Sequence, residues 1–299
     1  PSVIWGIDGD WMVNIIPAGV PFYPTDHCGV LRIKTEKILP EYMMYALQAE
    51  GEYERFSRNN RASAQRIRSL VVQAPETKIQ KNIIDELKAL DDKINGQNAE
   101  IEKYENSIRT KFDQIFHLEE FISDGVFSKY EGYSVEDLCI DGRGRVINQQ
   151  YIENHKGPYP VYSSQTTNDG IFGSIDTFDF DGEYITWTTD GAKAGTVFYR
   201  NGKFNCTNVC GTLKAKNDKV NMRYLAYLLN RIAYKFVSRV GNNKLMNDAM
   251  KKIVVPVPKR QLQDEFADFV QSVEKSKFEC IGKKEKVEVE KDTFVHKYF

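Results

Sequence analysis

Two short runs of the sequence combine cationic, amide and hydroxyl side chains. The first, SRNNRASAQR, begins at Ser57, and the second, SRVGNNK, begins at Ser238. Arginine and lysine bind phosphate oxygens, while asparagine, serine and arginine offer donors and acceptors to the edges of bases. These runs therefore predict a nucleic-acid surface. The alternative is that the asparagines and serines simply form turns.

The candidate contacts lie in predicted loops of the two halves of the chain, including a DGRGR segment, the residues after a Pro-Tyr-Pro turn and the surroundings of an Asp-Gly turn. Those in the first half are Arg58, Asn59, Asn60, Arg61, Ser63 and Arg66. Those in the second half are Arg143, Arg145, Tyr162, Ser163, Ser164, Gln165, Asn168, Thr189, Lys193, Arg239, Asn242, Asn243 and Lys244.

The charge is balanced in sum and segregated in sequence. The net charge is −1, yet residues 193–260 carry fifteen Lys/Arg against two acids, and residues 125–192 carry four against eleven. Residues 55–72 hold five arginines and no acid. A chain of this kind can present basic faces to a polyanion although its total charge is near zero. Solvated charged faces are the alternative.

The sequence contains no motif of an active site that we recognise. It lacks a GxxxxGK[ST] phosphate loop and an Asn-Pro-Pro-aromatic methyltransferase segment. No Ser, Cys or carboxylate stands at a triad spacing from the four histidines, which are His27, His117, His155 and His296. Cys206 and Cys210 are close in sequence but have no histidine near them, so a zinc site is not expected. We expect no catalysis, cofactor or metal.

Length and apolar patterning place the chain among globular proteins. Its 299 residues suffice for two domains and a connector. No run approaches eighteen apolar residues and no signal-peptide pattern opens the sequence, which favours a cytoplasmic protein without a membrane segment. Five scattered cysteines argue against a disulfide framework.

Two long helices must position the candidate loops. Apolar residues recur every seven positions in both, at Leu87, Ile94, Ile101, Ile108 and Ile115 and again at Phe266, Val273, Cys280, Val287 and Phe294. This is the spacing of a coiled-coil seam. The first helix, from about residue 77 to 121, would span roughly 60 Å at 1.5 Å per residue. We expect an antiparallel pair acting as a spacer; two unrelated amphipathic helices are the alternative. Asn95-Gly96 predicts a kink or break.

The chain repeats itself. YITWTTDG matches SVIWGIDG, TNVCGTLKA matches TDHCGVLRI, NMRYLAYLL matches PEYMMYALQ, the Ser-Arg pairs match, and VVPVPKRQLQ matches VVQAPETKIQ. These five matches lie 181 to 183 positions apart. A sixth, AGTVFY against AGVPFY, lies 176 positions apart. Matches in the same order indicate a duplication, in which each unit is one mixed domain followed by one long helix.

The predicted fold is α/β (α+β), with two mixed, largely antiparallel-sheet domains separated by an antiparallel pair of long coiled-coil helices. The expected boundaries are a first domain at 1–75, a spacer helix at 76–122, a second domain at 128–258 and a second helix at 259–299. The second domain runs about fifty residues before it reaches the counterpart of the first residues of the chain. We therefore expect fifty to sixty residues of the first domain to lie upstream of Pro1.

These features together resemble the specificity subunit of Type I restriction-modification enzymes. The resemblance covers essentially all 299 residues, through two target-recognition domains, GPYPVYSS, the Asp190-Gly191 turn, TNVCGTLKA and the proline-containing entry into each helix. It implies a non-catalytic subunit that reads a bipartite target in double-stranded DNA. Two methylation subunits would dock on its helices beside a restriction/translocase subunit. Half-sites about one turn apart, roughly 10 base pairs, would follow.

Two other functions remain open from the sequence. One is the recognition region of a DNA adenine methyltransferase whose catalytic domain is absent from these residues. The other is a coiled-coil scaffold that binds no DNA.

Overall fold

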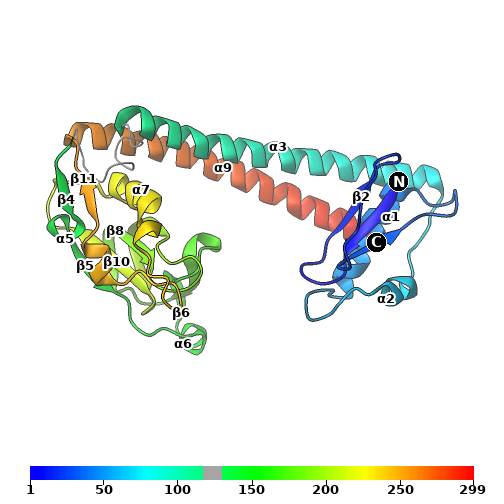
Figure 1. The fold of residues 1–299 in the computed structure, drawn as a ribbon, viewed down its shortest axis with the longest axis horizontal. Helices are drawn as coiled ribbons and strands as arrows, with labels where there is room; N and C mark the ends of the chain where they lie inside the picture. The colour runs from blue at the N-terminus through cyan, green and yellow to red at the C-terminus, as the bar shows by residue number, and fades with distance from the viewer. Residues whose placement is uncertain (117–129) are drawn as a thin grey trace. The chain divides into compact units, whose positions relative to one another are not determined.

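The structure is a computed structural model that describes residues 1–116 and 130–299. The chain forms two compact units, each built from a sheet domain and parts of two long helices, α3 (Thr77–Phe116) and α9 (Arg260–Tyr298) (Figure 1). Unit 1 comprises Pro1–Tyr104 and Lys275–Phe299, and unit 2 comprises Glu105–Glu274. The end of the first helix expected at 121 or 122, and the start of the second domain expected at 128, lie outside the described residues.

Unit 1 contains a three-stranded antiparallel sheet in the order β2-β1-β3. Its elements are β1 (Ser2–Gly6), β2 (Val13–Ile16), β3 (Cys28–Leu31), α1 (Pro40–Tyr53) and α2 (Ala64–Ser69). Helix α1 begins at a proline, which suits the first turn because that position lacks an intrahelical donor bond. Of the stripe expected on this helix, Tyr42, Ala46 and Leu47 are buried and Tyr45 is half-buried.

Unit 2 contains a six-stranded sheet in the order β5-β10-β8-β9-β6-β7, in which only β6 and β9 pair in parallel. A second sheet pairs β11 with β4. The strands are β4 (Gly132–Ser134), β5 (Cys139–Arg143), β6 (Lys156–Tyr162), β7 (Ile171–Ile175), β8 (Phe180–Thr188), β9 (Val197–Cys206), β10 (Cys210–Ala215) and β11 (Val254–Pro256). The helices are α5 (Val135–Leu138), α6 (Gln149–Asn154), α7 (Met222–Ile232) and α8 (Asn247–Lys251), with 3-10 turns η1 (Asn168–Gly170) and η2 (Ala233–Phe236).

The duplication predicted from the sequence is present in the strand pairing. Trp5 on β1 lies opposite Gly29 on β3, and Trp187 on β8 lies opposite Gly211 on β10. A Cβ atom on Gly29 would stand 2.1 Å from the Trp5 ring, and one on Gly211 would stand 2.2 Å from the Trp187 ring. Each tryptophan therefore requires a glycine on the neighbouring strand.

The sixth sequence match, AGTVFY against AGVPFY, is wrong. Val197 in the first of these segments pairs with Trp187, and the residue that pairs with Trp5 is Val13 on β2. Residues 18–23 lie beyond the end of β2 and belong to no strand. Four identical residues suggested an alignment of the two segments, but this alignment disagrees with the strand pairing.

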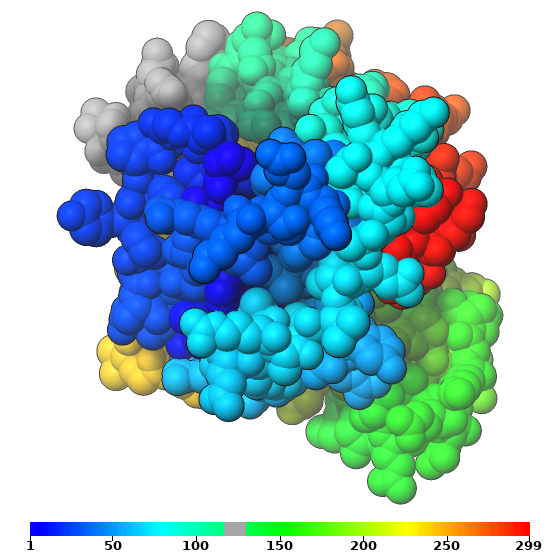
Figure 2. Space-filling view, turned by 90° about the vertical axis from the view of Figure 1, so that its right-hand side faces the viewer, coloured from blue at the N-terminus to red at the C-terminus, as the bar shows by residue number. Residues whose placement is uncertain are grey.

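The long helices pair antiparallel in each unit. In unit 1 the Lys291 ammonium lies 2.7 Å from an Asp91 carboxylate oxygen, and Leu87 packs in one cluster with Phe294. In unit 2 the rings of Phe112 and Phe266 lie 5.0 Å apart, centroid to centroid. Figure 2 shows the cyan first turns of α3 against the red last turns of α9 in unit 1. Of the residues predicted from the heptads, Leu87 and Phe294 share one hydrophobic cluster, and Ile108 and Phe266 share another.

Helix α3 continues without a break through Asn95 and Gly96, so the expected break is wrong. A glycine in a helix costs only about 1 kcal/mol relative to alanine, and packing along the paired helices outweighs it. A Cβ atom on Gly96 would meet nothing within 4 Å. The position therefore tolerates a side chain.

We predict that Gly96→Ala raises the free energy of unfolding by about 1 kcal/mol, because alanine restricts the unfolded chain and fits the exposed helix surface. Thermal or urea denaturation followed by circular dichroism would measure it. The matched control is Ala99→Gly at an exposed position one turn away, which should lower stability by a similar amount. A destabilised Gly96→Ala protein would contradict the open surface at this position.

Candidate nucleic-acid interface

A buried tryptophan in each unit holds the end of one candidate loop. The indole N–H of Trp5 donates to the carbonyl of Ala62 at 2.9 Å, and that of Trp187 donates to the carbonyl of Leu245 at 2.8 Å. Both rings are at most 5% exposed. A buried indole N–H requires an acceptor. Ala62 lies within the first cationic run of the sequence, directly after Arg61, and Leu245 directly follows the second run, which ends at Lys244. The core thus fixes one backbone carbonyl at or next to each run.

The carbonyl of Val209, in the turn between β9 and β10, accepts hydrogen bonds from two loops of unit 2. It accepts the Thr189 backbone N–H at 3.2 Å and the Thr189 hydroxyl at 2.9 Å, and it also accepts the Ser164 hydroxyl. Beside it, the Thr207 hydroxyl donates to the Ser163 hydroxyl at 2.9 Å. Segments that the sequence separates by 20 to 45 residues therefore meet at one place.

The remaining loops of unit 2 join the same cluster. Leu245 N–H donates to the Thr189 carbonyl at 3.0 Å, and Gly191 N–H donates to the Asn243 carbonyl at 3.1 Å. The Arg143 guanidinium donates to the Thr189 hydroxyl at 3.3 Å. The structure thus brings together the 163–170 loop, the 189–195 loop, the 207–209 turn and the 238–244 hairpin, which we call the recognition loops of unit 2.

Cations stand exposed on these loops. Lys193, Arg239 and Lys244 are exposed, and none forms an ion pair with another described residue. Arg145 differs, because its guanidinium lies 2.8 Å from the Asp179 carboxylate. The exposed three are available to phosphate oxygens, whereas Arg145 is already neutralised by a carboxylate.

The cationic hairpin differs in length between the units. In unit 1, Ser57 and Asn60 exchange backbone hydrogen bonds of 3.0 Å across two residues. In unit 2, Ser238 and Lys244 exchange bonds of 2.8 and 2.9 Å across five residues. The closing pair is therefore retained while the tip changes in both length and sequence.

The ladder that holds the loops recurs in unit 1. Ala62 N–H donates to the Ile7 carbonyl, and Ile7 N–H donates to the His27 carbonyl, both at 2.9 Å. Here an acidic residue adds a polar network: the Asp8 carboxylate lies 2.9 Å from the His27 ring nitrogen and 3.1 Å from the Arg61 guanidinium. Arg61 is thus partly neutralised.

The other candidate residues of unit 1 are of two kinds: some brace the segment through hydrogen bonds, and others lie at the exposed end of the hairpin. Asn60 accepts a hydrogen bond of 2.6 Å from Arg66, and the Ser63 hydroxyl caps the N-terminus of α2. Arg58 and Asn59 occupy the exposed hairpin tip, and Arg58 has no ion pair with a described residue. These two side chains face solvent, while the others hold the segment in place.

The candidates of the 163–170 loop in unit 2 are mostly half-buried. Burial raises the pKa of the Tyr162 phenol, which therefore stays protonated and able to donate. The Gln165 amide donates to the Ile171 carbonyl and so braces the loop. Asn168 is exposed in this loop, and Asn242 is exposed at the tip of the 238–244 hairpin.

Sequence reasoning missed two members of this arrangement. One is the turn containing Thr207 and Val209, and the other is Asp8. The repeat was the available signal, because TDHC and TNVC occupy the same place before a strand in both units. The convergence of the 163–170 and 189–195 loops on the Val209 carbonyl requires the sheet topology.

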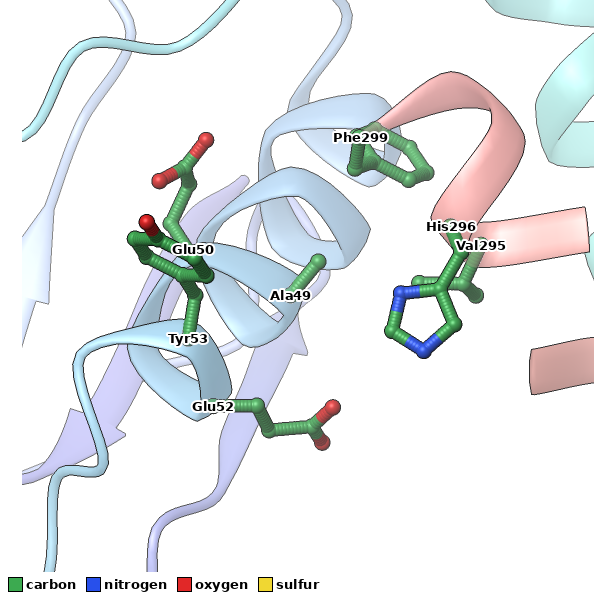
Figure 3. A pocket seen from close by; sticks show the side chains of 7 residues that line it. All are labelled: Ala49, Glu50, Glu52, Tyr53, Val295, His296 and Phe299. Atoms are coloured by element: carbon green, nitrogen blue, oxygen red, sulfur yellow. The ribbon is translucent and has the colours of Figure 1, made fainter. Parts of the chain in front are cut away.

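A cavity of about 390 Å³ in unit 1 lies apart from the candidate residues. Figure 3 shows its lining side chains, which come from the last turns of α1 and the end of α9. They are Ala49, Glu50, Glu52, Tyr53, Val295, His296 and Phe299. Its two carboxylates would repel phosphate, so it does not belong to a nucleic-acid surface.

Within residues 1–116 and 130–299, no three His, Cys, Asp or Glu side chains are grouped to hold a metal ion. All five cysteines are free thiols, and burial raises the pKa of Cys139 to about 12. Across the same described residues, no helix has the length and apolar character needed to span a membrane.

Comparison with known proteins identifies the family. The family model of the Type I restriction modification DNA specificity domain matches residues 1–103 and 128–291. The chain belongs to this family of type I specificity subunits. A Mycoplasma pneumoniae relative in the family is 39% identical over 212 residues, which are 70% of this chain and 77% of the relative. The Type I restriction enzyme MpnII specificity subunit of the same organism is 48% identical over 147 residues, 49% of this chain and 44% of its own length.

Solved structures support the fold of this specificity subunit. The crystal structure of a Type-I restriction-modification S subunit from M. genitalium aligns over 100% of this chain and 82% of its own, with a TM-score of 0.61 at 16% identity. A structure from work on assembly and conformational transition of the type I R-M system aligns over 99% and 81%, with a TM-score of 0.51 at 13% identity. The mixed, largely antiparallel fold with long helices is thus confirmed.

We predict that Trp187→Phe in this specificity subunit lowers stability by about 1–3 kcal/mol, because the Leu245 carbonyl loses its buried donor. Urea denaturation would measure the change. Tyr234→Phe, at an exposed ring of the same unit, is the control and should change stability by less than about 0.5 kcal/mol. Equal stability of the Trp187→Phe protein and the unaltered chain would contradict the anchoring role of the indole.

Proposed function

We propose that this specificity subunit reads a split sequence in double-stranded DNA, one half through the loops of unit 1 and the other through the recognition loops of unit 2. The chain itself supplies recognition, while methylation and cleavage belong to other subunits. The proposed partners are two methylation subunits docked on the long helices and a restriction/translocase subunit. The proposed compartment is the cytoplasm.

The repeated ladder with unlike tips is the observation that carries this proposal. Both units close a cationic hairpin with a serine, and both anchor its end to a buried tryptophan. The tip has two residues in one unit and five in the other. A common support with different exposed side chains is what two readers of different half-sites require, because base readout depends on which donors and acceptors reach the groove.

Within the loops we assign two roles. The exposed side chains contact phosphate or base edges, and these are Arg58, Asn59, Arg61, Arg143, Asn168, Lys193, Arg239, Asn242 and Lys244. The less exposed side chains set the loop conformation from beneath, and these are Asn60, Ser63, Arg66, Arg145, Tyr162, Ser163, Ser164, Gln165, Thr189 and Asn243.

Selection from a randomised duplex library, with the methylation partner present, tests the proposal. We expect enrichment of two short motifs separated by a fixed gap, with an affinity that falls steeply as salt rises because cations release counterions from phosphates. Binding without enrichment, or no binding, would contradict DNA reading and favour a scaffold. Enrichment of one motif alone would restrict reading to one unit.

We predict that the double variant Arg239→Glu, Lys244→Glu weakens DNA binding at least tenfold. The dependence of log affinity on log salt should become shallower by about one for each phosphate that the variant no longer neutralises. Fluorescence anisotropy at several salt concentrations would measure both quantities. Lys286→Glu, an exposed cation of α9, is the control and should leave affinity unchanged. Equal weakening of binding in the two proteins would point to net charge alone.

A further inference from the structure

Arg200 on β9 is a buried cation that no prediction from the sequence included. Its side chain is 4% exposed. A buried guanidinium is tolerated only when its charge and its donors are satisfied. The Nε atom donates to the Thr186 hydroxyl at 3.2 Å, and two further nitrogens donate to the side chain and the backbone carbonyl of Asp169, the latter at 2.7 Å.

Two aromatic rings lie against this guanidinium. Its central carbon lies 3.7 Å from the centroid of the Tyr162 ring and 4.5 Å from that of Phe198. The planar, delocalised charge of arginine suits this position, whereas the compact ammonium of lysine could not stack and fork in the same way. The site is therefore specific for arginine.

The carboxylate and carbonyl that Arg200 grips belong to a strained turn. Asn168, Asp169 and Gly170 have φ values of 49°, 50° and 78°, so three consecutive residues adopt the left-handed conformation. For residues with a side chain this conformation is unfavourable, and it persists only where the surroundings impose it. The paired contacts from Arg200 to Asp169 supply that constraint.

The turn in question is the far end of the 163–170 loop. The Ser163 N–H donates to the Gly170 carbonyl at 3.1 Å, which links the start of the loop to the strained turn. Ser163 and Ser164 in turn contact the 207–209 turn, and Asn168 is exposed. A change in the conformation of Asp169 would therefore displace the polar groups that the loop presents.

We propose that Arg200 is a positioning residue for sequence readout by unit 2. It fixes the 163–170 loop from beneath without contacting DNA, and it thereby sets the preference for one half of the target. This inference rests on the proposed function, because it assumes that the recognition loops read DNA.

Unit 1 provides an internal control. The strand register places Arg200 opposite Tyr184, and the equivalent position of unit 1, opposite Ser2, is Ile16. Among the described residues the clamp thus belongs to unit 2. Loss of it should alter one half-site and spare the other.

The test is selection from a randomised duplex library with the full chain and its methylation partner, using Arg200→Lys, Arg200→Met and Asp169→Asn. We expect discrimination between bases to fall roughly tenfold at positions of one motif, while the second motif and the gap stay unchanged. Asp169→Asn removes the negative charge but little volume, so this variant can still test the inference if Arg200→Met fails to fold. Arg231→Lys, in an ion pair with Asp113 on α3, is the control and should leave both motifs intact.

Equal weakening of both motifs would overturn the inference, since a general loss of structure acts on both. Unchanged motifs in the Arg200→Lys and Asp169→Asn proteins would overturn it as well. If the unaltered chain selects no motif, the proposed function itself fails, and the inference falls with it. Thermal unfolding of each variant separates reduced stability from impaired readout.

Discussion

A buried glutamine at the start of each long helix joins that helix to its sheet domain, and the position of the loops depends on this joint. Gln80 and Gln263 are fully buried. In both, the carboxamide oxygen accepts a backbone N–H at 2.8 Å and the nitrogen donates to two backbone carbonyls, with partners Leu39, Lys37 and Pro75 in unit 1 and Asn221, Lys219 and Pro258 in unit 2. One side chain thus satisfies three backbone groups, each of which would cost about 1–3 kcal/mol if buried alone.

Two further side-chain hydrogen bonds recur in both units, one from a tyrosine and one from a tryptophan. The Tyr42 hydroxyl donates to the Gln73 carbonyl and the Tyr224 hydroxyl to the Pro256 carbonyl, both at 3.0 Å, just before the long helices begin. The indoles then hold the ends of the cationic hairpins. Because these supports are the same in both units, the exposed tips can differ without altering them. The tips can therefore change in length and sequence while the domain keeps its attachment to the helix.

The sequence predicted those features that depend on spacing along the chain. The heptads predicted the helix pair, because apolar periodicity directly specifies a buried stripe, and the repeat predicted that Trp5 and Trp187 occupy equivalent strands. The repeat aligns Gln263 with Gln80 but does not predict their burial, which depends on where the chain folds back. The expected break at Asn95 failed because packing outweighs propensity. The Val209 cluster and the Arg200 clamp required strand order, which no local pattern encodes.

Amide hydrogen exchange of the Gln263→Leu protein tests most directly whether the glutamine joint holds the domain on its helix. Leucine has a similar size but no hydrogen bonds. If the joint acts as described, the Asn221 amide should exchange roughly tenfold faster or more than in the unaltered chain, because its buried acceptor is gone, and exchange at Leu39 in unit 1 should stay the same. Unchanged exchange at Asn221 would contradict the central role given to this side chain.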